Sequence, residues 1–201
     1  MNRDYLTNLT FGITFLNLAI VGVTALKLEC TFHTVVRLGS LLCNLMMGAL
    51  LLFNKRSVSA HSPLYKPFWL LMIICNMLIV KMIDGGQPAV GLPSVIFVIG
   101  LVAVVFSLFS LGGSFAVTPM SSEVKTRFAY SLVRHPMYLG ESMMVLACVL
   151  ATRDLISLPV FLLFVLSVVL RIREEEALLV KSEQYRRYCA STRWRIIPFV
   201  W

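Results

Sequence analysis

Four long apolar segments, separated by short polar ones, dominate the first half of the chain. They are residues 9–28, 35–53, 68–83 and 93–111. A helix crosses a bilayer with roughly 20 mostly apolar residues, and about 17 suffice at the short end. The pattern therefore predicts four transmembrane helices within residues 1–111. The first segment is longer than the apolar core of a signal peptide and no small-residue cleavage site follows it, so we interpret it as a helix.

A fifth apolar stretch, residues 136–170, is long enough for two short spans. Arg153 and Asp154 interrupt it near the middle. Because charges are costly inside a bilayer, we expect the chain to turn at these two residues and form a helical hairpin. The sequence thus predicts an all-α integral membrane protein with about six transmembrane helices, the last two a hairpin, followed by a polar tail.

The composition agrees with this interpretation. The chain is 58% hydrophobic and 14% charged, whereas soluble domains average about 45–50% apolar and about 25% charged residues. Little of the chain is left for a separate soluble domain, so any site must be built from helices, the loop after residue 111 and the tail. The five cysteines are odd in number and form no C-x-x-C pair, which predicts neither a disulfide framework nor a metal site.

The distribution of basic residues predicts the topology. Six spans with both termini cytoplasmic place most of the 18 lysines and arginines in cytosolic segments, as the positive-inside rule requires. The outer side then holds only Lys27, Arg37, Lys81 and Arg153. The net charge of +8 is explained by attraction to anionic lipid headgroups. We therefore expect membrane lipids, and no nucleic acid, as partners.

A first polar cluster stands at the start of the predicted hairpin, in the sequence Arg134-His-Pro-Met-Tyr-Leu-Gly140. Proline is favoured at the first position of a helix, so Pro136 is expected to begin one, with His135 at its cap. Free backbone N–H groups there, together with Arg134, would suit an anion such as the carboxylate of an amino-acid-like cofactor. The alternative is an ordinary helix start with interfacial side chains.

A second polar cluster, Arg171-Ile-Arg-Glu-Glu-Glu176, follows the last apolar segment. Arg171 and Glu175 are one helical turn apart and share a face. The preceding apolar segment is short for a bilayer core, which places Arg171 at or below the membrane border, where charges usually mark function. Adjacent glutamates repel one another and require a cation. The alternative is a solvated helix with surface pairs Arg171–Glu175 and Arg173–Glu176, each of little energetic value.

The predicted hairpin brings these two clusters together. The first stands at the cytosolic start of span five, and the second at the cytosolic end of span six. Antiparallel helices joined by a tight outer turn must place these ends side by side. This juxtaposition, at the inner mouth of the last two spans, is the main structural prediction from the sequence.

Taken together, the two clusters resemble a known family. The motif RHPMYLGE, a hydrophobic hairpin, R-x-x-x-E-E, Tyr185-Arg-Arg-Tyr188 and Arg195-Ile-Ile-Pro198 occur in this order. The sequence over residues 111–201, including its Leu111-Gly-Gly-Ser-Phe115 opening, is similar to the isoprenylcysteine carboxyl methyltransferase / phospholipid methyltransferase family. The resemblance implies membrane helices whose last hairpin and tail enclose S-adenosyl-L-methionine without a Rossmann domain. Residues 112–201 would form this cofactor-binding methyltransferase core.

The resemblance also implies roles for individual residues. The residues expected to line the cofactor are Tyr130, His135, Pro136, Met137 and Tyr138. Glu175 would contact the cofactor and Arg171 would face the substrate, and these two would be the catalytic pair. The sequence departs from the family at one place, because Phe128-Ala129 stands where the family often has Gly-Pro before the tyrosine.

The sequence leaves the methyl acceptor open. The resemblance implies a lipophilic small-molecule or lipidated substrate that reaches the site from the bilayer. An isoprenylcysteine carboxylate, a phospholipid amine and a thiol are the alternatives. Two other classes of protein remain: an intramembrane reductase using NADPH, which would need further basic groups for the 2′-phosphate, and a non-enzymatic membrane scaffold or transporter, which would not bind S-adenosyl-L-methionine.

Overall fold

The structure, a computed structural model, describes residues 3–24, 30–53, 65–83, 91–111, 126, 128–152 and 154–201. These residues form helices and connecting turns. The helices are α1 (Arg3–Thr24), α2 (Phe32–Phe53), α3 (Tyr65–Lys81), α4 (Leu92–Leu111), α5 (Ala129–Leu132), α6 (Pro136–Thr152), α7 (Ser157–Leu179) and α8 (Glu183–Ser191). The predicted all-α fold is confirmed for this part of the chain.

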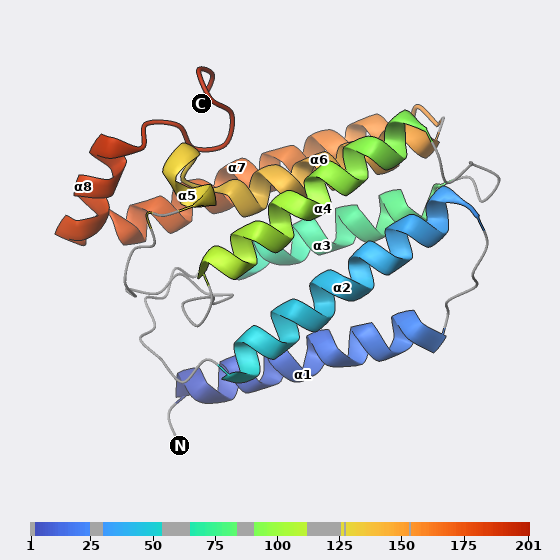
Figure 1. Ribbon diagram of the computed structural model, residues 1–201, viewed down its shortest axis with the longest axis horizontal. Helices are drawn as coiled ribbons and strands as arrows, with labels where there is room; N and C mark the ends of the chain where they lie inside the picture. The colour runs from blue at the N-terminus through green and yellow to red at the C-terminus, as the bar shows by residue number, and fades with distance from the viewer. Residues whose placement is uncertain are drawn as a thin grey trace.

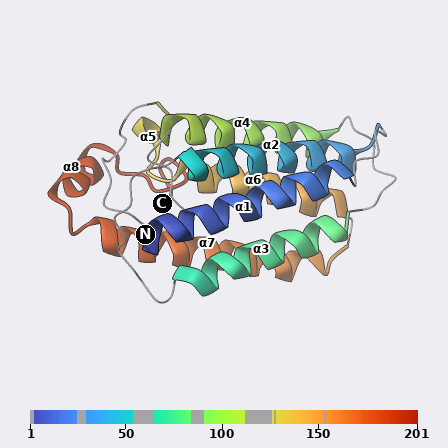
Figure 2. The same ribbon diagram turned by 90° about the horizontal axis from the view of Figure 1, so that it is seen from below.

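The long helices lie side by side in a bundle, and the short ones gather at one of its ends (Figures 1 and 2). Helix α6 packs against α4 and α7, α3 packs against α7, and α2 packs against both α1 and α4. Helices α5 and α8 and the C-terminal residues lie at the same end of the bundle as the start of α1 (Figure 1). The two short helices and the polar tail therefore lie together at that end of the bundle.

Apolar side chains cover much of the outside of the bundle. On α4, for example, Val102 and Phe109 are 61% and 74% exposed, and on α7 Leu162 is 67% exposed. Soluble proteins rarely expose large continuous apolar surfaces, so this outer face is suited to lipid. Two helical segments, Phe32–Leu52 and Leu92–Leu111, are long and apolar enough to cross a membrane. The six crossings and the cytoplasmic position of both termini stay predictions.

The predicted helical hairpin is present. Helix α6 ends at Thr152 and α7 begins at Ser157, and the two helices pack together. Asp154 stabilises the turn because its carboxylate accepts a hydrogen bond from the amide of Ile156 at 3.0 Å and its carbonyl accepts one from the Ser157 hydroxyl at 2.6 Å. Arg153, the other residue of the predicted turn, lies outside the described residues.

A backbone contact fixes α6 against α4. A Cβ atom at Gly140 would lie 2.6 Å from the carbonyl oxygen of Gly100, and one at Gly100 would lie 2.7 Å from the carbonyl oxygen of Gly140. Neither position has room for a side chain, because both clashes are with backbone. Gly140 thus permits the close approach of α4, which fixes the beginning of α6 within the bundle.

The structure describes the tail but little of the loop that follows residue 111. Residues 112–125 and 127 of this loop, which include the 112–115 part of the family opening, lie outside the described residues. The tail is described in full. Trp201 packs against the main apolar core, and the Arg195 guanidinium carbon lies 5.2 Å from its ring centroid. The most exposed apolar side chain of the tail is that of Phe199, at 86%.

Candidate active site

The site begins at the N-terminus of α6, where the tail pairs with the chain. Helix α6 starts at Pro136, as predicted. The amide of Arg134 donates to the carbonyl of Trp194 at 2.9 Å, and the amide of His135 donates to the carbonyl of Arg195 at 2.8 Å. The two N–H groups that precede α6 are thus occupied by the protein itself. Through these two backbone hydrogen bonds the tail forms part of the site.

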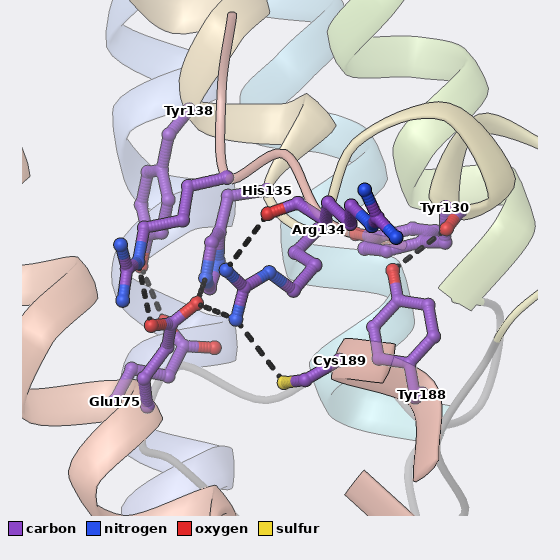
Figure 3. A network of polar contacts seen from close by, with 10 residues as sticks. Tyr130, Arg134, His135, Tyr138, Glu175, Tyr188 and Cys189 are labelled. Atoms are coloured by element: carbon purple, nitrogen blue, oxygen red, sulfur yellow. Dashed lines mark hydrogen bonds and ion pairs between the residues drawn. The ribbon is translucent and has the colours of Figure 1, made fainter. Parts of the chain in front are cut away.

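A first polar network joins α6 to α7 through Tyr138 (Figure 3). The Tyr138 hydroxyl donates to Oε2 of Glu175 at 2.9 Å and accepts a hydrogen bond from Nε of Arg171 at 2.5 Å. Arg171 is only 4% exposed, and its guanidinium carbon lies 5.2 Å from the Tyr138 ring centroid. The two predicted catalytic side chains are therefore bridged by a predicted cofactor-lining residue.

A second polar network surrounds Glu176, the next residue along α7. Its Oε1 lies 2.8 Å from Nη1 of Arg134 and 3.2 Å from Nε2 of His135, and its Oε2 lies 2.7 Å from Nε of Arg195. Arg134 continues the network to Sγ of Cys189 and the carbonyl of Arg193, both at 3.1 Å. Glu176 thus ties the start of α6 and the tail to α7. The alternative interpretation paired Glu176 with Arg173 on the surface, whereas the contacts of Glu176 are with Arg134, His135 and Arg195.

Glu176 is held in its charged form. Burial alone would raise the pKa of this carboxyl, but hydrogen bonds from His135 and Arg195, and the charges of His135 and Arg134, lower the pKa to about 2. Two guanidinium groups on one carboxylate give strong, charge-assisted contacts. The physical role of this network is to hold three segments of the chain together.

Tyr130 lies on α5, beside the two networks. It is buried with Tyr185 and Tyr188 in a separate small cluster, and its carbonyl accepts a hydrogen bond from the Tyr188 hydroxyl at 2.7 Å (Figure 3). Burial raises the pKa of the Tyr130 hydroxyl, and the nearby charge of Glu175 raises it further. Tyr130 therefore belongs to the electrostatic surroundings of Glu175, although the tyrosine cluster fixes its position.

The departure from the family pattern has a structural counterpart at Phe128, which caps α5. Its φ of 57° and ψ of −123° form a backbone conformation that favours glycine and strains other residues by roughly 1–3 kcal/mol. Glycine, which the family often has here, would adopt it freely. The loop thus keeps a glycine-like conformation without the glycine.

A further carboxyl group, which the sequence analysis did not assign, lies near the first network. Glu141 follows Tyr138 by three residues on α6, so the two side chains are about one turn apart. Its Oε2 is buried and has no hydrogen-bond partner among the described residues. The charges of Arg171 and Glu175 act on it. The signal that could have found Glu141 is an ionisable residue inside an otherwise apolar segment.

The structure brings most of the predicted residues together, with different kinds of contact. His135, Tyr138, Arg171 and Glu175 meet at the base of the hairpin. Pro136 is buried, and Met137 packs against two apolar clusters, so these two contribute apolar surface. The contact of Glu176 with Arg195 could not be predicted, because no spacing rule pairs α7 with a tail residue beyond α8.

A comparison with known protein families covers the region of this site. Residues 88–186 match the model of the phospholipid methyltransferase family, whereas no curated protein gives a significant match. The matched region contains α4 to α7 and the start of α8, and thus both polar networks except their tail residues. Through this region the chain belongs to the phospholipid methyltransferase family of integral membrane methyltransferases.

Proposed function

We propose that this protein transfers a methyl group from S-adenosyl-L-methionine to a lipophilic acceptor at the cytosolic face of the membrane, in the manner of an isoprenylcysteine carboxyl methyltransferase. The observation that carries the proposal is the Arg171–Tyr138–Glu175 network, which lies at the base of the α6–α7 hairpin within the region that matches a methyltransferase family. A cation, a hydroxyl and a carboxylate converge there from two helices.

The chemistry of these side chains fits the cofactor. S-adenosyl-L-methionine carries an ammonium, a sulfonium and a carboxylate, and when bound it supplies a methyl group on the positively charged sulfur. Glu175 is suited to hold the ammonium end. Within the described part of the chain, the buried Oε2 of Glu141 has no hydrogen-bond partner. A buried acceptor without a partner is costly, so a cationic or hydrogen-bonding ligand would stabilise this oxygen.

The residues of the chain then have separate tasks. Tyr138 holds Glu175 and Arg171 in fixed positions, and Arg171 orients the acceptor. Holding two reactants in line contributes several kcal/mol to a displacement reaction. A carboxylate acceptor is already ionised and needs no base, and Arg171 could bind it bidentately. An amine acceptor must lose a proton, for which Glu175 or His135 is the candidate base.

A phospholipid amine is the second candidate acceptor. The description of the matched family as phospholipid methyltransferases favours it, and the same residues could serve it. A thiol remains a third alternative. NADPH is less suited to the site, because the two arginines beside it, Arg134 and Arg195, are already paired with Glu176.

Calorimetric titration of the detergent-purified protein with S-adenosylhomocysteine tests the proposal. We expect saturable binding by the wild type and about tenfold weaker binding by Glu175→Gln, because an interaction with a charged group contributes about 1.5–3 kcal/mol. Glu183→Gln, at an exposed pair with Arg187, is the matched control and should bind like the wild type. Absence of binding by the wild type would remove the methyltransferase proposal.

A further inference from the structure

Glu141 has an unusual position for a carboxyl group. It lies on α6, an otherwise apolar helix. Met144, three residues further along this helix, packs against both large apolar clusters. One of its carboxylate oxygens is buried without a hydrogen-bond partner among the described residues. A carboxyl group in such a place is retained at a cost in stability, which calls for a function.

The surroundings of Glu141 belong to the candidate active site. Arg171 and Glu175 are the charges that act on its carboxyl, and the charge of Glu141 in turn acts on Tyr130. Helix α6 supplies Glu141 and Tyr138 about one turn apart, and Tyr138 is bonded to Arg171 and Glu175. Glu141 and Glu175 therefore both lie within the electrostatic range of the Arg171 guanidinium.

Among the described residues, the carboxyl groups of Glu141 and Glu175 outnumber the single guanidinium of Arg171 here, so a cation would stabilise both of them in their charged form. The other arginines of the site do not supply it, because Arg134 and Arg195 are bound to Glu176. A ligand with one net positive charge would supply such a cation. S-adenosyl-L-methionine has this net charge at neutral pH, with two positive groups and one negative group, whereas its demethylated product, S-adenosylhomocysteine, has none.

The two carboxyl groups also differ in depth along α6 and α7. Tyr138 is level with Glu175 through their hydrogen bond, and Glu141 is three residues further along α6, which is about 4.5 Å at 1.5 Å per residue. Glu175 therefore stands nearer the polar mouth, and Glu141 nearer the apolar interior. A lipophilic acceptor approaches from the apolar side, so the transferable methyl group and its sulfur should face that side too.

We propose that Glu141 binds the sulfonium of the methyl donor, while Glu175 binds the ammonium, so that Glu141 makes the site prefer the charged donor to the neutral product. This inference rests on the proposed function and goes beyond it, because it assigns Glu141 and divides the two carboxyl groups by the ligand charge that each meets. The preference has a use in turnover: when the methyl group leaves, the positive charge leaves the sulfur, and the interaction that held the donor is lost.

The test compares two ligands against two variants by calorimetry. Donor and product share the ammonium and differ in the sulfur charge. Glu141→Gln should bind S-adenosyl-L-methionine about tenfold more weakly and S-adenosylhomocysteine almost unchanged, whereas Glu175→Gln should lose affinity for both ligands by a similar factor. The tenfold figure follows from the lower range for hydrogen bonds to charged groups, about 1.5 kcal/mol.

A conservative variant keeps the test decisive. Glu141→Asp retains the charge and should retain the preference for the donor, even if its overall affinity falls. Equal losses for both ligands in Glu141→Gln, or no loss for either, would overturn the inference and leave Glu141 as a packing residue. A wild type that binds neither ligand would instead overturn the proposed function, and this inference with it. Thermal unfolding of each variant shows whether it is folded.

Discussion

Glu175 and Glu176 are neighbours on α7, yet their environments differ completely. Glu176 contacts Arg134, His135 and Arg195, so that both of its oxygens are paired with basic side chains. Among the described residues, Glu175 receives one hydrogen bond, from the neutral hydroxyl of Tyr138. One carboxylate is saturated by the protein and the other is not. Saturated charges hold a fold together, whereas an incompletely paired charge is available to a ligand.

This difference in pairing explains how the site can be rigid and still bind a ligand. The Glu176 network joins α7 to the residue before α6 and to the tail, and it thereby fixes the frame in which Tyr138 and Glu175 stand. Binding groups held by a supporting shell of paired side chains keep their geometry before the ligand arrives. Substitutions in the two networks should therefore separate loss of activity from loss of stability.

The largest effect is expected for Arg171→Ala on turnover. Arg171 holds Tyr138 and is proposed to orient the acceptor, and a displacement of about 1 Å at such a position can cost about 100-fold in rate. We expect methyl transfer to fall by at least about 100-fold, while affinity for S-adenosylhomocysteine is largely kept. Arg187→Ala, at an exposed position, is the control. Equal losses of turnover and affinity would contradict this division of roles.

Glu176→Gln should have the largest effect on stability. Removing one partner of a buried ion pair costs about 3–5 kcal/mol, and 1 kcal/mol shifts the unfolding midpoint by about 2–4 °C for a chain of this length. We therefore expect the midpoint in detergent to fall by roughly 10 °C, against little change for Glu175→Gln. The exposed Glu183→Gln should also change little. Similar midpoints for Glu175→Gln and Glu176→Gln would remove the distinction between the two networks.

A smaller effect is expected on the acid side of the stability curve. The pKa of Glu176 is lowered from 4.5 to about 2 in the folded protein, so its contribution to stability is fully present above pH 4.5 and is lost as the pH falls toward 2. The unfolding midpoint of the wild type should therefore fall more steeply over this range than that of Glu176→Gln. Parallel curves for the two proteins would show that Glu176 is not held in its charged form.

Much of the fold could be predicted because the signals are local. Apolar segment lengths and the Arg153-Asp154 interruption predicted the α6–α7 hairpin, and the hairpin required Tyr138 and Glu175 to meet. The six membrane crossings stay a prediction, because helical segments such as Leu70–Lys81 and Pro136–Thr152 are apolar but short.

The site was predicted less completely, because several of its contacts depend on tertiary packing. The amides before Pro136 looked free, since nothing in the local sequence shows that Trp194 and Arg195 will pair with them. The contact of Glu176 with Arg195 could not be predicted for the same reason. Glu141 is different, because an ionisable residue within an apolar helix is visible in the sequence. The family resemblance, however, implied roles only for its neighbours in the motif.

The pairing between the start of α6 and the tail also has a consequence for biosynthesis. Arg134 bonds to the carbonyl of Arg193, 59 residues further along the chain. A ribosome adds about 5–20 residues per second, so this partner emerges roughly 3–12 s later. Helices α6 and α7 can thus form before the contacts around Glu176 exist. The order of translation makes the candidate active site one of the last parts of the described fold to form.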